Sequence, residues 1–172
     1  MAVINVAYTA PVNPPGTTAP LTAPQIWEGL KDKVRHAEKF VPIITACEVL
    51  LETGDGDDTA GHTVKRAVTF RPGAAGPGGG TAGGRVVEVC KLYAPCRIDF
   101  EQEDGTRVGN YVSEGPDGEL YMTYVFQWKV DGVATGSVEA GELAAKYKKV
   151  SFLPCLAVVV EFAWGVGRLL TE

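Results

Sequence analysis

The first 40 residues combine one strand-like segment with one helix-like segment. Residues 3–12 form a β-branched and aromatic run that ends at the turn Asn13-Pro14-Pro15-Gly16, which predicts a strand. Thr22 and Gln25 then form a capping-box pattern, in which side chains satisfy the first amides of a helix. Apolar residues follow at spacings of three and four, which predicts an amphipathic helix with one buried face. They are Trp27, Leu30, Val34 and Ala37.

From residue 43 onward, apolar and polar residues alternate with a period of two, which is typical of strands. The predicted strands cover residues 43–52, 63–70, 85–93, 96–102, 107–113 and 121–130. Two connectors, at residues 103–105 and 115–118, have the short Asp-Gly turn chemistry of antiparallel hairpins. Together with the first strand, this pattern predicts a seven-stranded antiparallel sheet built as a meander.

The C-terminal part of the chain predicts a second, longer helix. Ser137 is a favourable N-cap residue, and acidic residues follow in the positive first turn. We expect the helix to run through Tyr147 and to kink or break at Pro154. Residues 150–172 are strongly apolar, so this segment either closes a cavity or docks on another subunit, as in a homodimer. Its apolar stripe consists of Val158, Val159, Phe162 and Val166.

Length and composition are those of one globular domain. The chain has 172 residues, of which 45% are hydrophobic and 22% charged, so we expect a single domain over residues 1–172. The formal net charge is −5. This charge argues against a nucleic-acid partner, because phosphate binding needs clustered lysine and arginine.

Neither a secretory signal nor a membrane span is expected. The amino-terminal segment lacks a basic stretch followed by an apolar run, which favours a cytoplasmic location. The longest apolar stretch is interrupted by Pro154 and Glu161, whereas a membrane span needs about 20 predominantly apolar residues.

Metal binding and disulfides are not favoured either. The four cysteines are widely spaced, and the only histidines, His36 and His62, stand far from each other in the sequence. Metal sites need close pairs of such ligands, so we predict reduced cysteines and no metal.

Five long segments carry a resemblance to a known family. They are Ile4 to Tyr8 with the following turn, KVRHAEKFVPIITACE at residues 33–48, EVCKLY at 88–93, RIDFEQEDG at 97–105 and GPDGELYMTYVFQW at 115–128. They resemble a fungal family of AtaL-like proteins in the START-like, or SRPBCC, superfamily, which includes the birch pollen allergen and aromatic polyketide cyclases. With the order of elements, the resemblance implies an α+β helix-grip fold, in which a curved seven-stranded antiparallel sheet wraps around a long C-terminal helix.

The resemblance covers residues 3–150, and two segments depart from the family pattern. The loop at residues 72–84 is longer and richer in glycine than expected, which predicts a flexible loop. A strand and not a helix follows these glycines, so phosphate binding is not favoured. The segment 150–172 is apolar where the family continues as a charged amphipathic helix.

Alternation within the strands predicts which side chains face a cavity, because successive residues of a strand point to opposite sides of the sheet. In the last strand the aromatic face must point inward. The side chains predicted to contact a ligand are Trp27, Leu30, Val108, Val112, Met122, Phe126, Trp128 and Tyr147.

Four polar side chains are candidates for catalysis, namely Tyr124, Asn110, Glu88 and Arg66. Asn110 and Tyr124 share their strand faces with apolar residues, and a buried polar group needs a partner. Asn110 therefore either makes a structural hydrogen bond, to the backbone or to Tyr124, or contacts a ligand. Arg66 and Glu88 form either a salt bridge at the rim, the more ordinary arrangement, or a buried pair that serves acid/base chemistry or anchors a carboxylate.

Three functional hypotheses follow. The chain holds an apolar small molecule in an internal cavity, and the resemblance implies a carrier or binding module in fungal secondary metabolism. The alternative is a cofactor-independent cyclase, isomerase or dehydratase that acts on a polyketide-like intermediate, since no motif joins a serine or cysteine nucleophile to a base. The third hypothesis is an interaction protein that uses its apolar C-terminal helix. No cofactor is expected.

Overall fold

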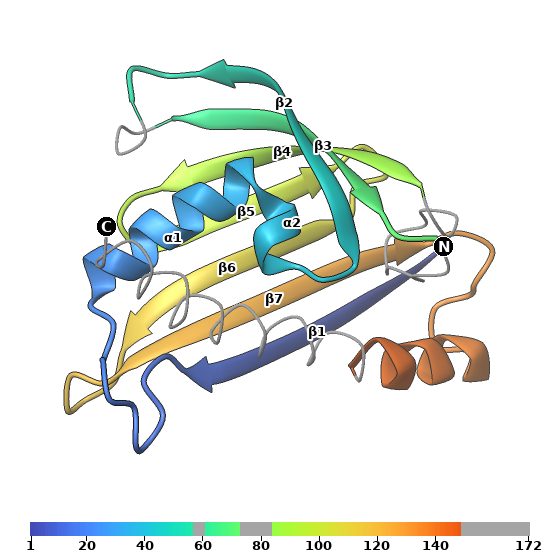
Figure 1. Ribbon diagram of the computed structural model, residues 1–172. Helices are drawn as coiled ribbons and strands as arrows, with labels where there is room; N and C mark the ends of the chain where they lie inside the picture. Colours follow the sequence, from blue (N-terminus) through green and yellow to red (C-terminus); the bar gives the residue numbers. More distant parts are fainter. Residues whose placement is uncertain (57–60, 73–83, 149–172) are drawn as a thin grey trace.

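The computed structural model describes all residues except 57–60, 73–83 and 149–172. In the described part, seven strands form one curved antiparallel sheet, and α1 and α2 lie on its concave side (Figure 1). The strands are β1 (Ala2–Pro11), β2 (Ile44–Thr53), β3 (Thr63–Phe70), β4 (Arg85–Tyr93), β5 (Arg97–Gln102), β6 (Arg107–Glu114) and β7 (Leu120–Val130). The helices are α1 (Ala23–Arg35), α2 (Ala37–Phe40) and a further helix that begins at residue 138 and is described to residue 148.

The strand order is β1-β7-β6-β5-β4-β3-β2, so strands β2 to β7 form a meander and β1 pairs with the last strand. All six pairings are antiparallel. The predicted α+β class and the seven-stranded sheet are therefore confirmed, and no predicted strand end differs from the observed one by more than one residue.

Both predicted helix starts are confirmed by their hydrogen bonds. The Gln25 side-chain oxygen accepts bonds from the backbone nitrogen and the hydroxyl of Thr22, at 2.8 and 2.9 Å. The Ser137 hydroxyl accepts a bond of 3.1 Å from the backbone nitrogen of Ala140. The end of the first helix differs from the prediction, because α1 ends at Arg35 and the apolar stripe continues across a break at His36 into α2.

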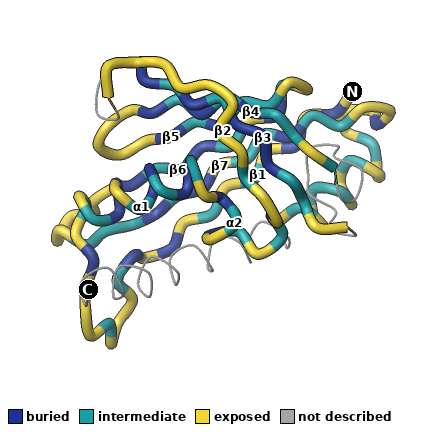
Figure 2. Tube along the Cα trace, turned by 45° about the horizontal axis from the view of Figure 1, so that its top comes forward, coloured by how far each residue is buried: buried dark blue, intermediate teal, exposed yellow. Residues whose placement is uncertain are grey.

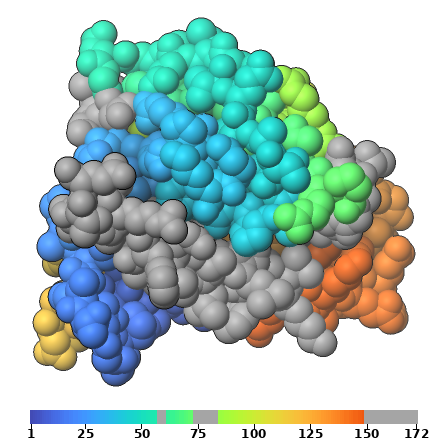
Figure 3. Space-filling model, in the orientation of Figure 1, coloured from blue at the N-terminus to red at the C-terminus, as the bar shows by residue number. Residues whose placement is uncertain are grey.

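The core lies between α1 and the concave face of the sheet. Ile26, Leu30 and Val34 have no exposed surface and pack in one cluster with side chains from β3 to β7. Buried segments line the strands and the sheet-facing side of α1 (Figure 2). In the space-filling view, α1, α2 and β2 cover much of the face turned to the reader (Figure 3).

The strand β2 is an edge of the sheet and departs from regular alternation. Its register with β3 shifts between Ile44 and Ala46 and again between Val49 and Leu51. Three consecutive apolar residues of this strand, Val49, Leu50 and Leu51, are 40%, 40% and 57% exposed. Each shift bends the strand locally and interrupts its ladder of hydrogen bonds.

Two predicted segments lie outside the described residues. The glycine-rich loop 72–84 is described only at its two ends, and the apolar segment 150–172 is not described. In the rest of the chain, no helix is both long and apolar enough to cross a membrane.

The fit of α1 into the sheet can be tested with two matched substitutions. Leu30→Ala removes a fully buried side chain and should lower the free energy of unfolding by about 2–5 kcal/mol, because it leaves a cavity. Leu51→Ala removes the same atoms from an exposed position and should change it by less than about 1 kcal/mol. Urea denaturation followed by circular dichroism measures both. Equal losses would contradict this packing.

Candidate functional site

An apolar patch on the concave face remains partly accessible to solvent. It consists of Val6 and Tyr8 on β1, Phe126 on β7 and Val108 on β6, which we call the accessible patch. Phe126 is the direct cross-strand neighbour of both Val6 and Val108, so the patch is continuous over three strands. The residues around it on the same face, such as Ile4, Ala10 and Tyr124, are buried.

Aromatic rings bound one end of the accessible patch. The ring of Phe126 stacks on the ring of Trp128, with centroids 4.9 Å apart and planes 28° apart. Tyr147, from the helix that begins at residue 138, meets Trp128 edge-on at 4.8 Å. The rings of the last strand therefore face inward as predicted, and the described part of the C-terminal helix contacts one of them.

Polar groups meet beside the patch. Asn110 has no exposed surface and is the cross-strand neighbour of Tyr124. In the amide orientation that satisfies both of its ends, Asn110 Oδ1 accepts a bond of 2.9 Å from Lys33 Nζ, and the amide nitrogen donates to the Gly109 carbonyl at 3.2 Å. Lys33 Nζ also lies 5.3 Å from the ring centroid of Tyr124. The expected backbone hydrogen bond of Asn110 is present, and its other partner is a lysine from α1.

Arg66 and Glu88 form a buried ion pair, so the rim salt bridge favoured by the sequence is wrong. The two residues are 3% and 5% exposed, and Arg66 Nε and Nη2 both donate to Glu88 Oε1, at 2.8 and 2.6 Å. They are direct cross-strand neighbours on β3 and β4. Gln102 Nε2 donates to the other carboxylate oxygen at 3.4 Å.

The ion pair is also joined to the end of α1. Arg66 Nη1 donates to the carbonyls of Lys33 and Val34, at 2.7 and 2.8 Å. A cation is favourable there, because the last carbonyls of a helix carry partial negative charge. Burial opposes the charged form of Arg66, but the neighbouring Cys90 and Glu88 raise its pKa above the ordinary value, so the guanidinium stays charged.

The thiol of Cys90 lies in the same buried layer. Burial raises the pKa of this thiol to about 12, although the Arg66 guanidinium acts in the opposite direction. The thiol is therefore protonated at neutral pH and is a poor nucleophile. Among the described residues Cys47, Cys90 and Cys96 are free thiols.

The predicted ligand-contacting residues divide into two groups. Trp27, Leu30, Val112 and Met122 belong to the buried core cluster. Val108 and Phe126 belong to the accessible patch, and Trp128 and Tyr147 form its aromatic border. Sequence analysis missed Lys33. Its position in the sequence could have indicated that it is buried, because Lys33 follows Leu30 by three residues and so shares the buried face of α1.

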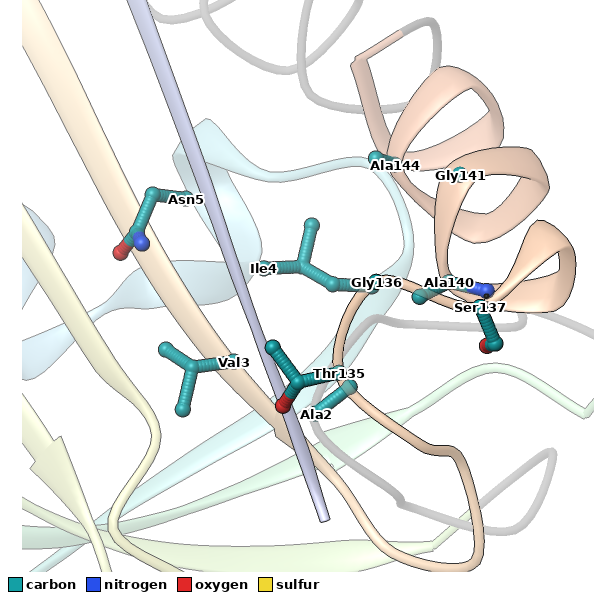
Figure 4. A pocket seen from close by; sticks show the side chains of 10 residues that line it. All are labelled: Ala2, Val3, Ile4, Asn5, Thr135, Gly136, Ser137, Ala140, Gly141 and Ala144. Carbon is teal, nitrogen blue, oxygen red and sulfur yellow. Dashed lines mark hydrogen bonds between the residues drawn. The ribbon is translucent and has the colours of Figure 1, made fainter.

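A groove of about 350 Å³ separates the start of β1 from the helix that begins at residue 138. It adjoins the face of β1 that carries Ile4 and the accessible patch. Ile4 points into it from the strand, and Ala140 and Gly141 face it from the helix (Figure 4). Most of the described residues that line it have small side chains, and none of these described residues is charged.

The sequence of this chain matches one protein family and one curated protein. A family model described as acetylaranotin biosynthesis cluster protein L matches residues 6–159. A curated protein of that name from Aspergillus terreus (strain NIH 2624 / FGSC A1156) is 26% identical over 155 residues, which span 90% of this chain and 84% of the relative.

Solved structures with low sequence identity share the fold. The Zhui aromatase/cyclase from Streptomyces sp. R1128 is 17% identical, with a TM-score of 0.61 over 96% of this chain and 94% of the other. A START superfamily protein from Mycobacterium smegmatis is 13% identical, with a TM-score of 0.59 over 96% and 99% of the two chains. These likenesses confirm the predicted helix-grip fold.

The buried ion pair predicts a non-additive pair of substitutions. Arg66→Met should lower the free energy of unfolding by about 3–5 kcal/mol, because Glu88 is then left buried without its partner. Glu88→Met should have a similar cost, and the double variant should lose at least about 1 kcal/mol less than the sum of the two.

Chemical denaturation of the three variants measures this coupling. Glu101→Gln is the control, since it breaks the partly exposed Lys91–Glu101 pair and should cost less than about 1 kcal/mol. Additive effects at Arg66 and Glu88 would contradict the buried pair.

Proposed function

The chain belongs to the family of acetylaranotin biosynthesis cluster protein L, and from this premise we propose that it binds an apolar small molecule of secondary metabolism on the concave face of its sheet. The observation that carries the proposal is the accessible patch of Val6, Tyr8, Val108 and Phe126. Its side chains alternate with outward ones along three adjacent strands, so they form one apolar surface.

The surroundings of the patch fit a small-molecule site. Such sites are mostly apolar and aromatic, with a few convergent polar groups that orient the ligand. Here the stacked rings of Phe126 and Trp128 supply the apolar part, and Asn110 and Tyr124 supply polar atoms on the same face. Covering the patch stabilises a complex by roughly 25 cal/mol for each Å² of apolar surface removed from water.

The comparisons support a ligand from biosynthetic chemistry. The curated relative is named for the acetylaranotin biosynthesis cluster, and one of the similar structures is an aromatase/cyclase. The function that we favour is a carrier or binding module for an intermediate of such a pathway. The cytoplasmic location and the homodimer formed through the C-terminal helix stay predictions, as does the role of that helix in an interaction protein.

A second candidate is a cofactor-independent cyclase, isomerase or dehydratase. It is favoured by the position of Tyr124 and Asn110, which are direct neighbours on the adjacent strands β7 and β6 next to the patch, with Lys33 Nζ close to both. Polar groups in an apolar wall interact strongly with a reacting molecule, because the local dielectric constant is low. In this case Tyr124 would move a proton, and Asn110 would hold a carbonyl oxygen.

The binding proposal predicts that one of two valine substitutions weakens ligand binding and that the other does not. Val108→Trp places a bulky ring on the accessible patch and should weaken binding of the neutral probe N-phenyl-1-naphthylamine at least tenfold. Val125→Trp places the same ring on the outer face of β7, where Val125 is 37% exposed, and should change binding by less than about twofold. Fluorescence titration measures both affinities. Equal binding by the two variants, or no binding by the unaltered protein, would contradict the proposal.

The enzyme candidate predicts a loss of rate without a loss of binding. Tyr124→Phe keeps the ring but removes the hydroxyl, so turnover should fall about 100-fold, a typical contribution of one acid/base group. Binding of N-phenyl-1-naphthylamine should stay within about threefold. The assay follows cyclisation of a poly-β-ketone thioester by liquid chromatography and mass spectrometry. Unchanged turnover in both Tyr124→Phe and Asn110→Ala would assign these residues a structural role.

A further inference from the structure

We propose that Gln102 is a specificity-determining residue of this face and that its side-chain oxygen accepts a hydrogen bond from the bound molecule. The inference rests on the proposed binding function and adds to it the chemical class of the ligand, which is an apolar body that carries a hydroxyl or N–H donor. Gln102 is the last residue of β5.

The first argument is the orientation of the Gln102 amide. Its nitrogen, Nε2, donates to Glu88 Oε2 at 3.4 Å, and the two residues are direct cross-strand neighbours on β5 and β4. The other oxygen of Glu88 accepts two hydrogen bonds from Arg66. A carboxylate oxygen only accepts hydrogen bonds, so the amide nitrogen of Gln102, and not its oxygen, has to face Glu88. The amide oxygen, Oε1, is therefore directed away from the ion pair.

The second argument is that this oxygen is buried without a donor. Gln102 is half-buried as a whole, but its Oε1 atom is buried, and no described residue donates a hydrogen bond to it. An unpaired buried acceptor is costly because it has lost its hydrogen bonds to water, and native structures contain few such atoms. A donor on a bound molecule removes this cost, which favours ligands that bring one.

The third argument is the position of Gln102 relative to the accessible patch. Gln102 shares the concave face with Phe100, which precedes it by two residues on β5. Phe100 is the direct neighbour of Val108, a member of the patch, so Val108 lies diagonally opposite Gln102, about 7–8 Å away. The last torsion angle of a glutamine side chain is soft, so Oε1 can turn toward a molecule on the patch while Nε2 stays near Glu88.

The fourth argument is the row of polar groups to which Gln102 belongs. Arg66, Glu88 and Gln102 are successive cross-strand neighbours on β3, β4 and β5, and hydrogen bonds join them in that order. An amide that donates to a carboxylate becomes a better acceptor at its oxygen, because linked hydrogen bonds polarise one another. The row starts at the last carbonyls of α1 and ends beside the accessible patch.

Two probes that differ by one hydroxyl group test the inference. 2-Naphthol carries a donor, and naphthalene does not. Gln102→Met keeps an unbranched side chain but removes the acceptor, so it should weaken binding of 2-naphthol about fivefold, a typical contribution of one neutral hydrogen bond. It should change binding of naphthalene by less than twofold. Displacement of N-phenyl-1-naphthylamine, whose own affinity is first measured for each variant, gives both affinities.

Gln127→Met is the matched control. It makes the same substitution on the outer face of β7, where Gln127 donates to Asn5, and should alter neither affinity by more than twofold.

A measurement on the unaltered protein covers the case in which Gln102→Met does not fold. The side-chain ¹³Cδ resonance of Gln102 responds to hydrogen bonding at Oε1. It should shift farther when 2-naphthol saturates the protein than when naphthalene does, since the ring-current effects of the two probes are alike. A water molecule that satisfied Oε1 and stayed in place would give equal shifts.

The outcomes separate this inference from the proposed function. Equal ¹³Cδ shifts, or effects of Gln102→Met that do not differ between the two probes, would overturn the role of Gln102 and leave the binding proposal intact. The inference alone also fails if N-phenyl-1-naphthylamine binds but 2-naphthol does not displace it. If N-phenyl-1-naphthylamine does not bind the unaltered protein, the proposed function fails, and this inference fails with it.

Discussion

A charged guanidinium that is almost completely withdrawn from water sets the geometry of the concave face. Arg66 is stable there because Glu88 and the last carbonyls of α1 together accept four hydrogen bonds from it. The same bonds tie β3, β4 and α1 to one point, so the helix has one preferred position on the sheet. This position of α1 brings Lys33 Nζ to the side chain of Asn110, so it also determines which polar groups lie beside the accessible patch.

The fold could be predicted well because its signals are local. Strand positions follow from alternation of apolar and polar residues, and the hairpins follow from turn residues such as Gly105 and Gly118, whose φ angles of +81° and +82° suit glycine. The helix starts at Thr22 and Ser137 were equally visible, because a capping group lies within three residues of the amide that it satisfies. The break at His36 was missed, since the apolar spacing runs through it.

The site was harder to predict because its contacts join residues far apart in the chain. Alternation places Arg66 and Glu88 each on a strand face but does not say which neighbour covers that face. The decisive partners of Arg66 are carbonyls 32 and 33 positions earlier, and backbone groups leave no trace in the sequence. Lys33 was missed for a related reason, since a lysine beside an apolar stripe is ordinarily a solvated flank.

The irregular edge strand has a consequence for the behaviour of this protein at high concentration. An exposed edge with three consecutive apolar residues, here Val49 to Leu51, is a template on which another chain can add a strand. The two register shifts in β2 interrupt the regular row of donors and acceptors that such an addition requires. The register shifts in β2 therefore oppose the addition of a strand from another chain. A substitution or deletion that restored a regular register would favour aggregation.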